Sequence, residues 1–116
     1  MQATFPFALG RIAFGAGLLA APERVAAGWL PGDAGRPGTR VAVRGLGARD
    51  VALAAGVVAA KRKRPWLVAC LACDLADIAA TLAAGDALPA RARWGTVALA
   101  GSAAIAGAAL TARVDK

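Results

Sequence analysis

The sequence has no histidine and no tyrosine, only two cysteines, and aromatic side chains at just 5% of its positions. The lack of histidine excludes a histidine general base and histidine metal ligands. Acidic residues are also scarce, with 7 Asp and Glu against 14 Lys and Arg. The candidates for chemistry are therefore a few carboxylates, the arginines near them and the two cysteines.

What the sequence has in abundance is apolar residues. The 116 residues are enough for one domain, and they are 59% hydrophobic with a mean hydropathy of +0.57, which is high for a soluble domain. Because 34 residues are alanine, which is only mildly hydrophobic, a soluble alanine-rich helical bundle is an alternative interpretation. Four long runs with few charges favour a membrane protein instead.

The net charge of +7 would suggest a nucleic-acid partner if the protein were soluble. Basic residues interleaved with aromatic ones, which are typical of nucleic-acid binding, are absent from the sequence. We therefore predict no nucleic-acid partner. The basic residues instead suit the ends of membrane helices, where they face anionic lipid of the bilayer.

The apolar runs predict an all-α fold, namely an antiparallel four-helix transmembrane bundle that forms a single domain over residues 1–116. The predicted helices cover about residues 5–21, 41–60, 65–84 and 94–112, with a short interfacial helix at 23–30. Trp29 and Trp66 are expected at the membrane interface, where amphipathic rings gather. Glycines in the first run, at positions 10, 15 and 17, would permit close helix contact.

Loop charges give the predicted orientation. An even number of spans places both termini on one side, together with the basic segment KRKR at residues 61–64, Arg113 and Lys116. The opposite side carries Arg24, Arg36, Arg40, Arg91 and Arg93. The density of KRKR favours the cytoplasmic side for both termini. The excess of Ala, Gly and Arg over Lys is typical of a GC-rich bacterial genome, so we expect a multi-pass protein of the bacterial inner membrane.

The third run carries two carboxylates, Asp74 and Asp77, in an otherwise apolar segment. Counted from Pro65 along a helix, they lie roughly 14 and 18 Å deep, near the middle of a bilayer about 30 Å thick. Carboxylates at that depth need partners and by default mark function. With Cys70 and Thr81 they form one polar stripe, which should face the bundle interior. The alternative is that the stripe only fixes the helix arrangement through hydrogen bonds.

The other predicted helices place further charges at a similar depth. Asp50 lies roughly 14 Å from either end of the second run, beside Arg49 and within reach of Arg44. Arg11 interrupts the first run, where it would act as a counter-ion to the aspartates. Two alternatives remain open: Arg11 could extend to the interface, and Arg49 and Asp50 could be interfacial charges just before a later-starting helix.

Two short motifs offer competing chemistry. The CxxC pair Cys70 and Cys73 is compatible with thiol redox or metal binding, but it lies well inside the run and has no second cysteine pair. The DxxD pair suggests magnesium-diphosphate binding, which needs more oxygen ligands than Asp50 alone adds. We therefore expect two small core side chains, with no metal and no cofactor.

The segments RIAFGAGLLAAPERV, RGLGARDVALAAG and CDLADIAA resemble small bacterial four-helix membrane proteins, some of which are grouped as DoxX-like. The resemblance implies a four-helix bundle and carries no agreed catalytic residues. Small multidrug-resistance transporters are similar in length and helix count. Their pattern has an embedded Glu in the first helix and an aromatic pocket, whereas this sequence has Arg11 and no Tyr.

The leading functional hypothesis is an acid-base enzyme, of cyclase, isomerase or epoxide-hydrolase type, acting on a lipophilic small molecule such as a terpenoid or polyketide. One protonated aspartate would donate a proton while an ionised one removes a proton or activates water. Asp74 and Asp77 are the first candidates and Asp50 the next, with Arg11 or Arg44 holding the ionised partner. The alternative is a non-enzymatic assembly partner or a small proton-coupled carrier, which would require a homodimer.

Overall fold

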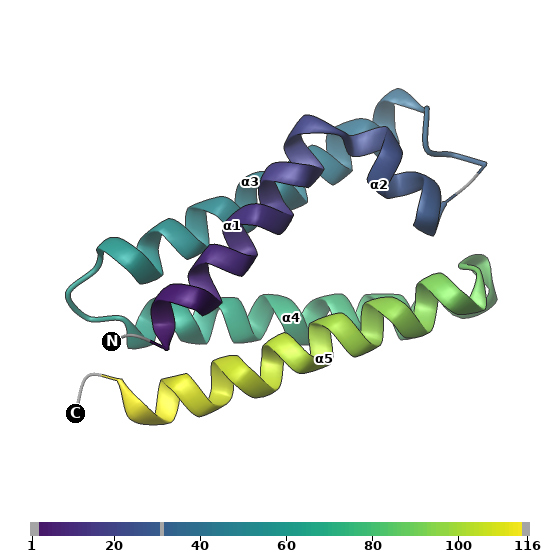
Figure 1. The fold of residues 1–116 in the computed structure, drawn as a ribbon. Helices are drawn as coiled ribbons and strands as arrows, with labels where there is room; N and C mark the ends of the chain where they lie inside the picture. Colours follow the sequence, from purple (N-terminus) through teal and green to yellow (C-terminus); the bar gives the residue numbers. More distant parts are fainter. Residues whose placement is uncertain (1–2, 31, 115–116) are drawn as a thin grey trace.

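The computed structural model describes residues 3–30 and 32–114, and within these ranges the chain is helical with no β-strand (Figure 1). The described α-helices are α1 (Thr4–Ala20), α2 (Pro22–Trp29), α3 (Pro37–Ala59), α4 (Arg64–Ala84) and α5 (Ala90–Arg113), and the 3-10 helix η1 (Gly85–Ala87) follows α4. The all-α prediction is confirmed. Within the described residues, the four long helices α1, α3, α4 and α5 correspond to the four predicted runs, and α2 corresponds to the short helix expected at 23–30. Lys116, used in the orientation argument, lies outside the described residues.

Prolines define where the helices begin. A proline occupies the first or second position of α2, α3 and α4, and Pro89 is the N-cap residue of α5. Proline suits these positions because the first N–H groups of a helix have no intrahelical acceptor. Two helices accordingly start earlier than the hydropathy pattern indicated: α3 starts at Pro37 instead of residue 41, and α5 at Ala90 instead of residue 94. Their first turns are polar, so hydropathy alone missed them.

A sharp bend separates α1 from α2. Pro22 has no N–H to continue the hydrogen bonding of α1, and Ala21 leaves the helical region with φ −136° and ψ 60°. The chain therefore bends by 100° between the two helices. As a result, α2 turns toward α5 and contacts it (Figure 1).

The long helices pack mainly as two pairs, α1 against α3 and α4 against α5. The first pair makes its closest approach at two glycines: a Cβ added to Gly15 would lie 2.7 Å from the backbone oxygen of Gly47, and one added to Gly47 would lie 2.6 Å from that of Gly15. Gly10 and Gly17, also predicted as contact glycines, have no such neighbour within 4 Å. The two pairs diverge toward α2, while the start of α1 and the end of α5 lie at one end of the molecule (Figure 1).

Trp66 joins the two pairs where the chain passes from α3 to α4. Its indole ring packs directly against Gly56 and leaves no space there for a Cβ. The residue was expected to be an interface anchor, and 39% of it is still exposed. Its ring therefore also serves as a packing surface for α3.

Two segments are long and apolar enough to cross a membrane, Arg64–Ala87 and Ala90–Arg113. The bent pair α1–α2 meets the same condition only when both helices are taken together. By the same test α3 is not a candidate span, because every stretch of about 18 residues along it contains Arg44, Arg49 and Asp50. Length and composition thus support two spans, or three if the bent pair is one span, rather than the four predicted.

The interior contains two apolar clusters, with buried charged residues between them. One cluster, near the chain ends, contains Ala8, Val57, Leu67 and Cys70 among its buried members. The other, near α2, contains Leu18, Ala26 and Val43. On α1 and α3 the buried charged residues lie between these clusters, so the charged groups are held between two apolar layers.

Candidate functional site

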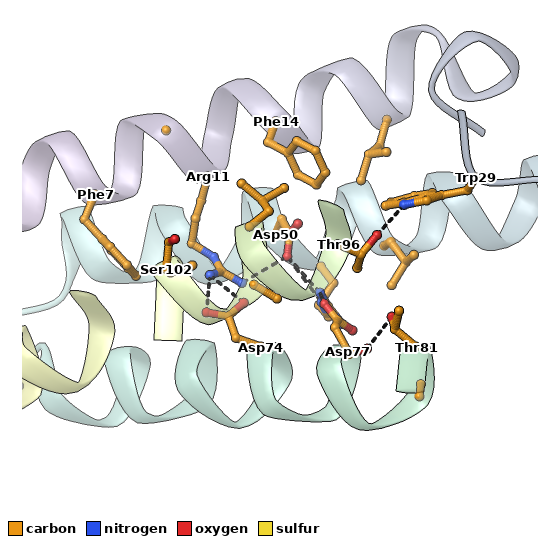
Figure 2. Close-up of a pocket in the computed structure, with 18 of the residues that line it drawn as sticks. Phe7, Arg11, Phe14, Trp29, Asp50, Asp74, Asp77, Thr81, Thr96 and Ser102 are labelled. Carbon is orange, nitrogen blue, oxygen red and sulfur yellow. Dashed lines mark hydrogen bonds and ion pairs between the residues drawn. The ribbon is translucent and has the colours of Figure 1, made fainter. Parts of the chain in front are cut away.

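Arg11 on α1 connects three helices in the interior (Figure 2). Its Nη1 donates to both carboxylate oxygens of Asp74 on α4, at 3.0 and 2.9 Å, and its Nη2 donates to Oδ1 of Asp50 on α3 at 3.2 Å. The three side chains are 9%, 6% and 7% exposed, respectively. Arg11 thus points inward as a counter-ion and is not extended to an interface.

Arg49 extends this arrangement from Asp50 to Asp77. Its Nη2 lies 3.1 Å from Oδ1 of Asp50 and 2.9 Å from Oδ2 of Asp77, and its Nη1 donates to Oδ1 of Asp77 at 3.2 Å. This end of the array is more open, with the Arg49 side chain 28% exposed and that of Asp77 34% exposed. We call the five residues Asp74, Arg11, Asp50, Arg49 and Asp77 the charge network.

The charge network has an odd number of charges. Three carboxylates against two guanidiniums leave one negative charge if every group is ionised. The excess charge is buried only in part, because Asp77 at one end of the network is 34% exposed. A site that alternates between holding and releasing one proton can act in acid-base chemistry.

The charge network forms one wall of a cavity of about 820 Å³ between the two helix pairs (Figure 2). The apolar lining comes from all five helices and includes Phe7, Phe14, Leu18, Leu46, Leu99 and Ala103. Small-molecule sites are typically about 300–1,000 Å³, mainly apolar, with a few convergent polar groups. The cavity has that combination of size and lining.

Contacts with α5 close the cavity at two places. Near the chain ends, Phe7 lies within van der Waals distance of the position of a Cβ on Gly107, at 3.6 Å. Toward α2, Trp29 Nε1 donates to Thr96 Oγ1 at 2.5 Å. The other residues of α5 that line the cavity, from Leu99 to Ala103, lie between these two contacts.

Trp29 and Thr96 are site residues that the sequence did not reveal. Trp29 was predicted only as a residue of the membrane interface; in the structure it is half-buried and lines the cavity. The 100° bend after α1 directs α2, and Trp29 at its end, toward α5. The only signal in the sequence was Pro22, which predicted the end of the first helix but not the direction of the next.

Of three other predicted site residues, Cys70 and Thr81 face the interior as expected, and Arg44 has a partner other than the aspartates. Arg44 does not join the aspartates: its Nε donates to the backbone oxygen of Leu19 at 3.4 Å, because it faces the end of α1. Cys70 is buried in the apolar cluster near the chain ends. Thr81 lines the cavity, and its hydroxyl donates to the backbone oxygen of Asp77 at 2.7 Å.

The carboxylates are separated by guanidinium groups and do not share one coordination centre. Within residues 3–30 and 32–114, no three His, Cys, Asp or Glu side chains are placed to hold one metal ion. Cys70 and Cys73 are both free thiols. The geometry of the charge network therefore favours proton exchange over metal coordination.

Comparison with protein-family models, characterised proteins and solved structures finds no match to this chain. The resemblance to DoxX-like proteins stays a prediction. The functional argument therefore depends on the geometry of the site.

Proposed function

We propose that the chain is an integral membrane protein whose long helices form an antiparallel bundle around a cavity for a lipophilic small molecule, on which it performs acid-base chemistry. The observation that carries the proposal is the convergence of three aspartates and two arginines on the wall of a mainly apolar cavity of about 820 Å³. The apolar walls suit a terpenoid-like or polyketide-like molecule, and the charge network supplies groups that exchange protons.

Exposed apolar side chains support the membrane setting. Ile105, Trp94 and Leu75 are 75%, 57% and 53% exposed, respectively, on helices long enough to cross the bilayer. Lipid would cover such side chains favourably. In this setting α3 also crosses, because Asp50 is paired with Arg11 and Arg49 with Asp77. We expect the bacterial inner membrane with both termini cytoplasmic, which reporter fusions at the C-terminus would test.

The ligand would reach the cavity sideways from the bilayer. The seam between α1 and α5 is closed by Phe7 at Gly107 and by α2 through the bond from Trp29 to Thr96. Between them lie Gly10 on α1 and small residues of α5 that line the cavity. A lipophilic molecule would pass there without crossing the charged loops.

Asp77 is the best candidate for the group that exchanges a proton with the ligand, since it lines the cavity and is the most exposed carboxylate of the charge network. Arg11 would pair with Asp50 and Asp74. For an epoxide, protonated Asp77 would give its proton to the epoxide oxygen, and an ionised aspartate would take a proton from the attacking water. The product is the diol, and the net reaction adds one water.

Ligand binding is tested with a photoactivatable alkyl diazirine alcohol in liposomes, followed by mapping of the labelled peptides. Gly10 lines the cavity and Gly17 does not, yet neither has an atom within 4 Å of an added Cβ. Gly10→Leu should therefore reduce labelling of the cavity-lining peptides of α1 and α5, while Gly17→Leu leaves it unchanged. Equal labelling in both variants would refute the cavity as a binding site.

Turnover is tested with a panel of lipophilic epoxides, in which hydrolysis is detected as a mass gain of one water. Asp77→Asn should abolish conversion while the protein stays folded. Asp77→Glu, which keeps the carboxyl group, should retain part of it. Full activity in Asp77→Asn or Asp74→Asn would end the assignment of these residues to acid-base chemistry.

A second candidate function, a non-enzymatic membrane partner or a carrier, is favoured by one specific observation. Every carboxylate of the charge network is already paired with a guanidinium, and Asp74 is held through both of its oxygens. Such pairing also serves to fix helices relative to each other. Loss of folding in both Asp74→Asn and Asp77→Asn, with no labelling of the cavity, would favour this role.

A further inference from the structure

A second pocket, of about 550 Å³, lies where α1 ends, α2 begins and the first turns of α3 pass beside them. It is separate from the charge network and shares no lining residue with the larger cavity. Its charged lining consists of Glu23, Arg24, Arg40 and Arg44. Arg44 thus belongs to this pocket rather than to the aspartates with which it was predicted to pair.

The pocket has more positive charge than its surroundings neutralise. Three arginines against Glu23 leave two positive charges. The C-terminal end of α1 contributes only about half a negative charge, through carbonyls such as that of Leu19, which accepts from Arg44 at 3.4 Å. More than one positive charge therefore remains without a counter-charge among residues 3–30 and 32–114.

The hydrogen bonds of these arginines leave donors available. Arg40 Nη2 contacts Glu23 at 2.7 Å and donates to the backbone oxygen of Gly35 at 3.3 Å, while its Nε is buried without a partner in the described residues. Arg24 has no ion-pair or hydrogen-bond partner within residues 3–30 and 32–114. Guanidinium groups that surround a pocket with free donors are suited to a phosphate, whose several oxygens accept such forked hydrogen bonds.

The position along α1 indicates where such a phosphate would come from. From Arg11 to Ala20 the helix rises about 13 Å, which is close to half of a hydrocarbon core about 30 Å thick. If the charge network lies at the middle of the membrane, as the proposed function requires, this pocket lies at the level of the lipid headgroups. We propose that it binds the phosphate of an anionic lipid headgroup through Arg24, Arg40 and Arg44.

The test measures lipid binding to the purified full chain in detergent by native mass spectrometry, with phosphatidylglycerol and phosphatidylcholine as probes. Arg24→Gln and Arg44→Gln should each weaken phosphatidylglycerol binding about five- to tenfold. Arg91→Gln is the matched control. Arg91 is also exposed without a partner in the described residues, and α5 begins at the same end of the molecule as α2 (Figure 1). It should change binding by less than about twofold.

Arg24→Gln also guards against loss of folding, because Arg24 makes no side-chain bond within the described residues. An equal loss of phosphatidylglycerol binding in all three variants would show only nonspecific electrostatic attraction and would overturn the proposal. Unchanged binding in Arg24→Gln and Arg44→Gln, or equal affinity for the two lipids, would also overturn it. Displacement of phosphatidylglycerol by inorganic phosphate would keep the anion site but assign it to free phosphate. Gly10→Leu should not alter this binding, so the result is independent of the larger cavity.

Discussion

Arg11 donates to both carboxylate oxygens of Asp74, which is 63 residues away along the chain. The same guanidinium also contacts Asp50, so one side chain joins α1, α3 and α4. Because all three side chains are less than 10% exposed, bulk solvent screens their charges only weakly. The helix arrangement and the charges on the cavity wall therefore depend on the same residue.

Arg11→Met should strongly destabilise the protein. The substitution leaves Asp50 and Asp74 without their shared cation in a buried site, which typically costs about 3–5 kcal/mol. The free energy of unfolding can be measured by SDS titration in mixed micelles, followed by circular dichroism. A loss below about 1 kcal/mol would contradict the buried pairing, since that is the range of exposed ion pairs.

The control is the triple variant Arg11→Met, Asp50→Asn, Asp74→Asn. With the carboxylates neutralised, the buried charge that Arg11→Met creates is removed, so much of the lost stability should return. If the triple variant were no more stable than Arg11→Met, lost packing of the arginine rather than unpaired charge would explain the effect.

The two aspartates of α4 should respond differently to the same change. Asp74→Asn removes the buried partner of Arg11 and should cost about 2 kcal/mol of unfolding free energy. Asp77→Asn removes a partner of Arg49 in a pair that solvent partly screens, since its side chain is 34% exposed, and should cost about 1 kcal/mol or less. The same SDS titration compares them. If Asp77→Asn lowered the unfolding free energy more than Asp74→Asn, our assignment of Asp74 as the structural carboxylate and Asp77 as the exchangeable one would be reversed.

The sequence was sufficient to predict that charged residues from three helices lie at a similar depth in the site. Arg11, Asp50, Asp74 and Asp77 each interrupt an apolar run, and helical rise alone places the aspartates at comparable depths. Their pairing follows from physical necessity, because charges in an apolar interior must find partners. Arg44 was assigned wrongly because depth along one helix does not fix which neighbouring helix its side chain faces.

The walls of the cavity were much harder to predict. They depend on the 100° bend between α1 and α2 and on the divergence of the two helix pairs, which arise from contacts between segments distant in sequence. Similarly, Gly15 could not be distinguished from Gly10 or Gly17 before its approach to Gly47 was known. Single glycines in an apolar run show that close contact is permitted but not where it occurs.

That difference among the glycines gives a direct test of the α1–α3 contact. Gly15→Ala places a Cβ 2.7 Å from the backbone oxygen of Gly47 and should cost about 1–3 kcal/mol through overpacking. Gly17 lies on the same helix, and an added Cβ there has no neighbour within 4 Å. Gly17→Ala should therefore leave the free energy of unfolding unchanged or raise it by about 0.5–1 kcal/mol through helix propensity. The measurement is the free energy of unfolding of both variants under identical detergent conditions. Equal stability would mean that α1 and α3 lie farther apart.

The bond between Trp29 and Thr96 should behave as a coupled pair that holds α2 over the cavity. Trp29→Phe keeps a ring at this position but removes the indole donor, and Thr96→Val removes the acceptor while keeping the shape. Each change should cost about 1 kcal/mol, and the double variant should cost little more than either one, because the same hydrogen bond is lost only once. Additive losses would show that the two groups do not interact. If α2 limits access to the cavity, Trp29→Phe should also increase the rate of diazirine labelling of the cavity-lining peptides of α5, whereas a bond that only stabilises the fold would leave that rate unchanged.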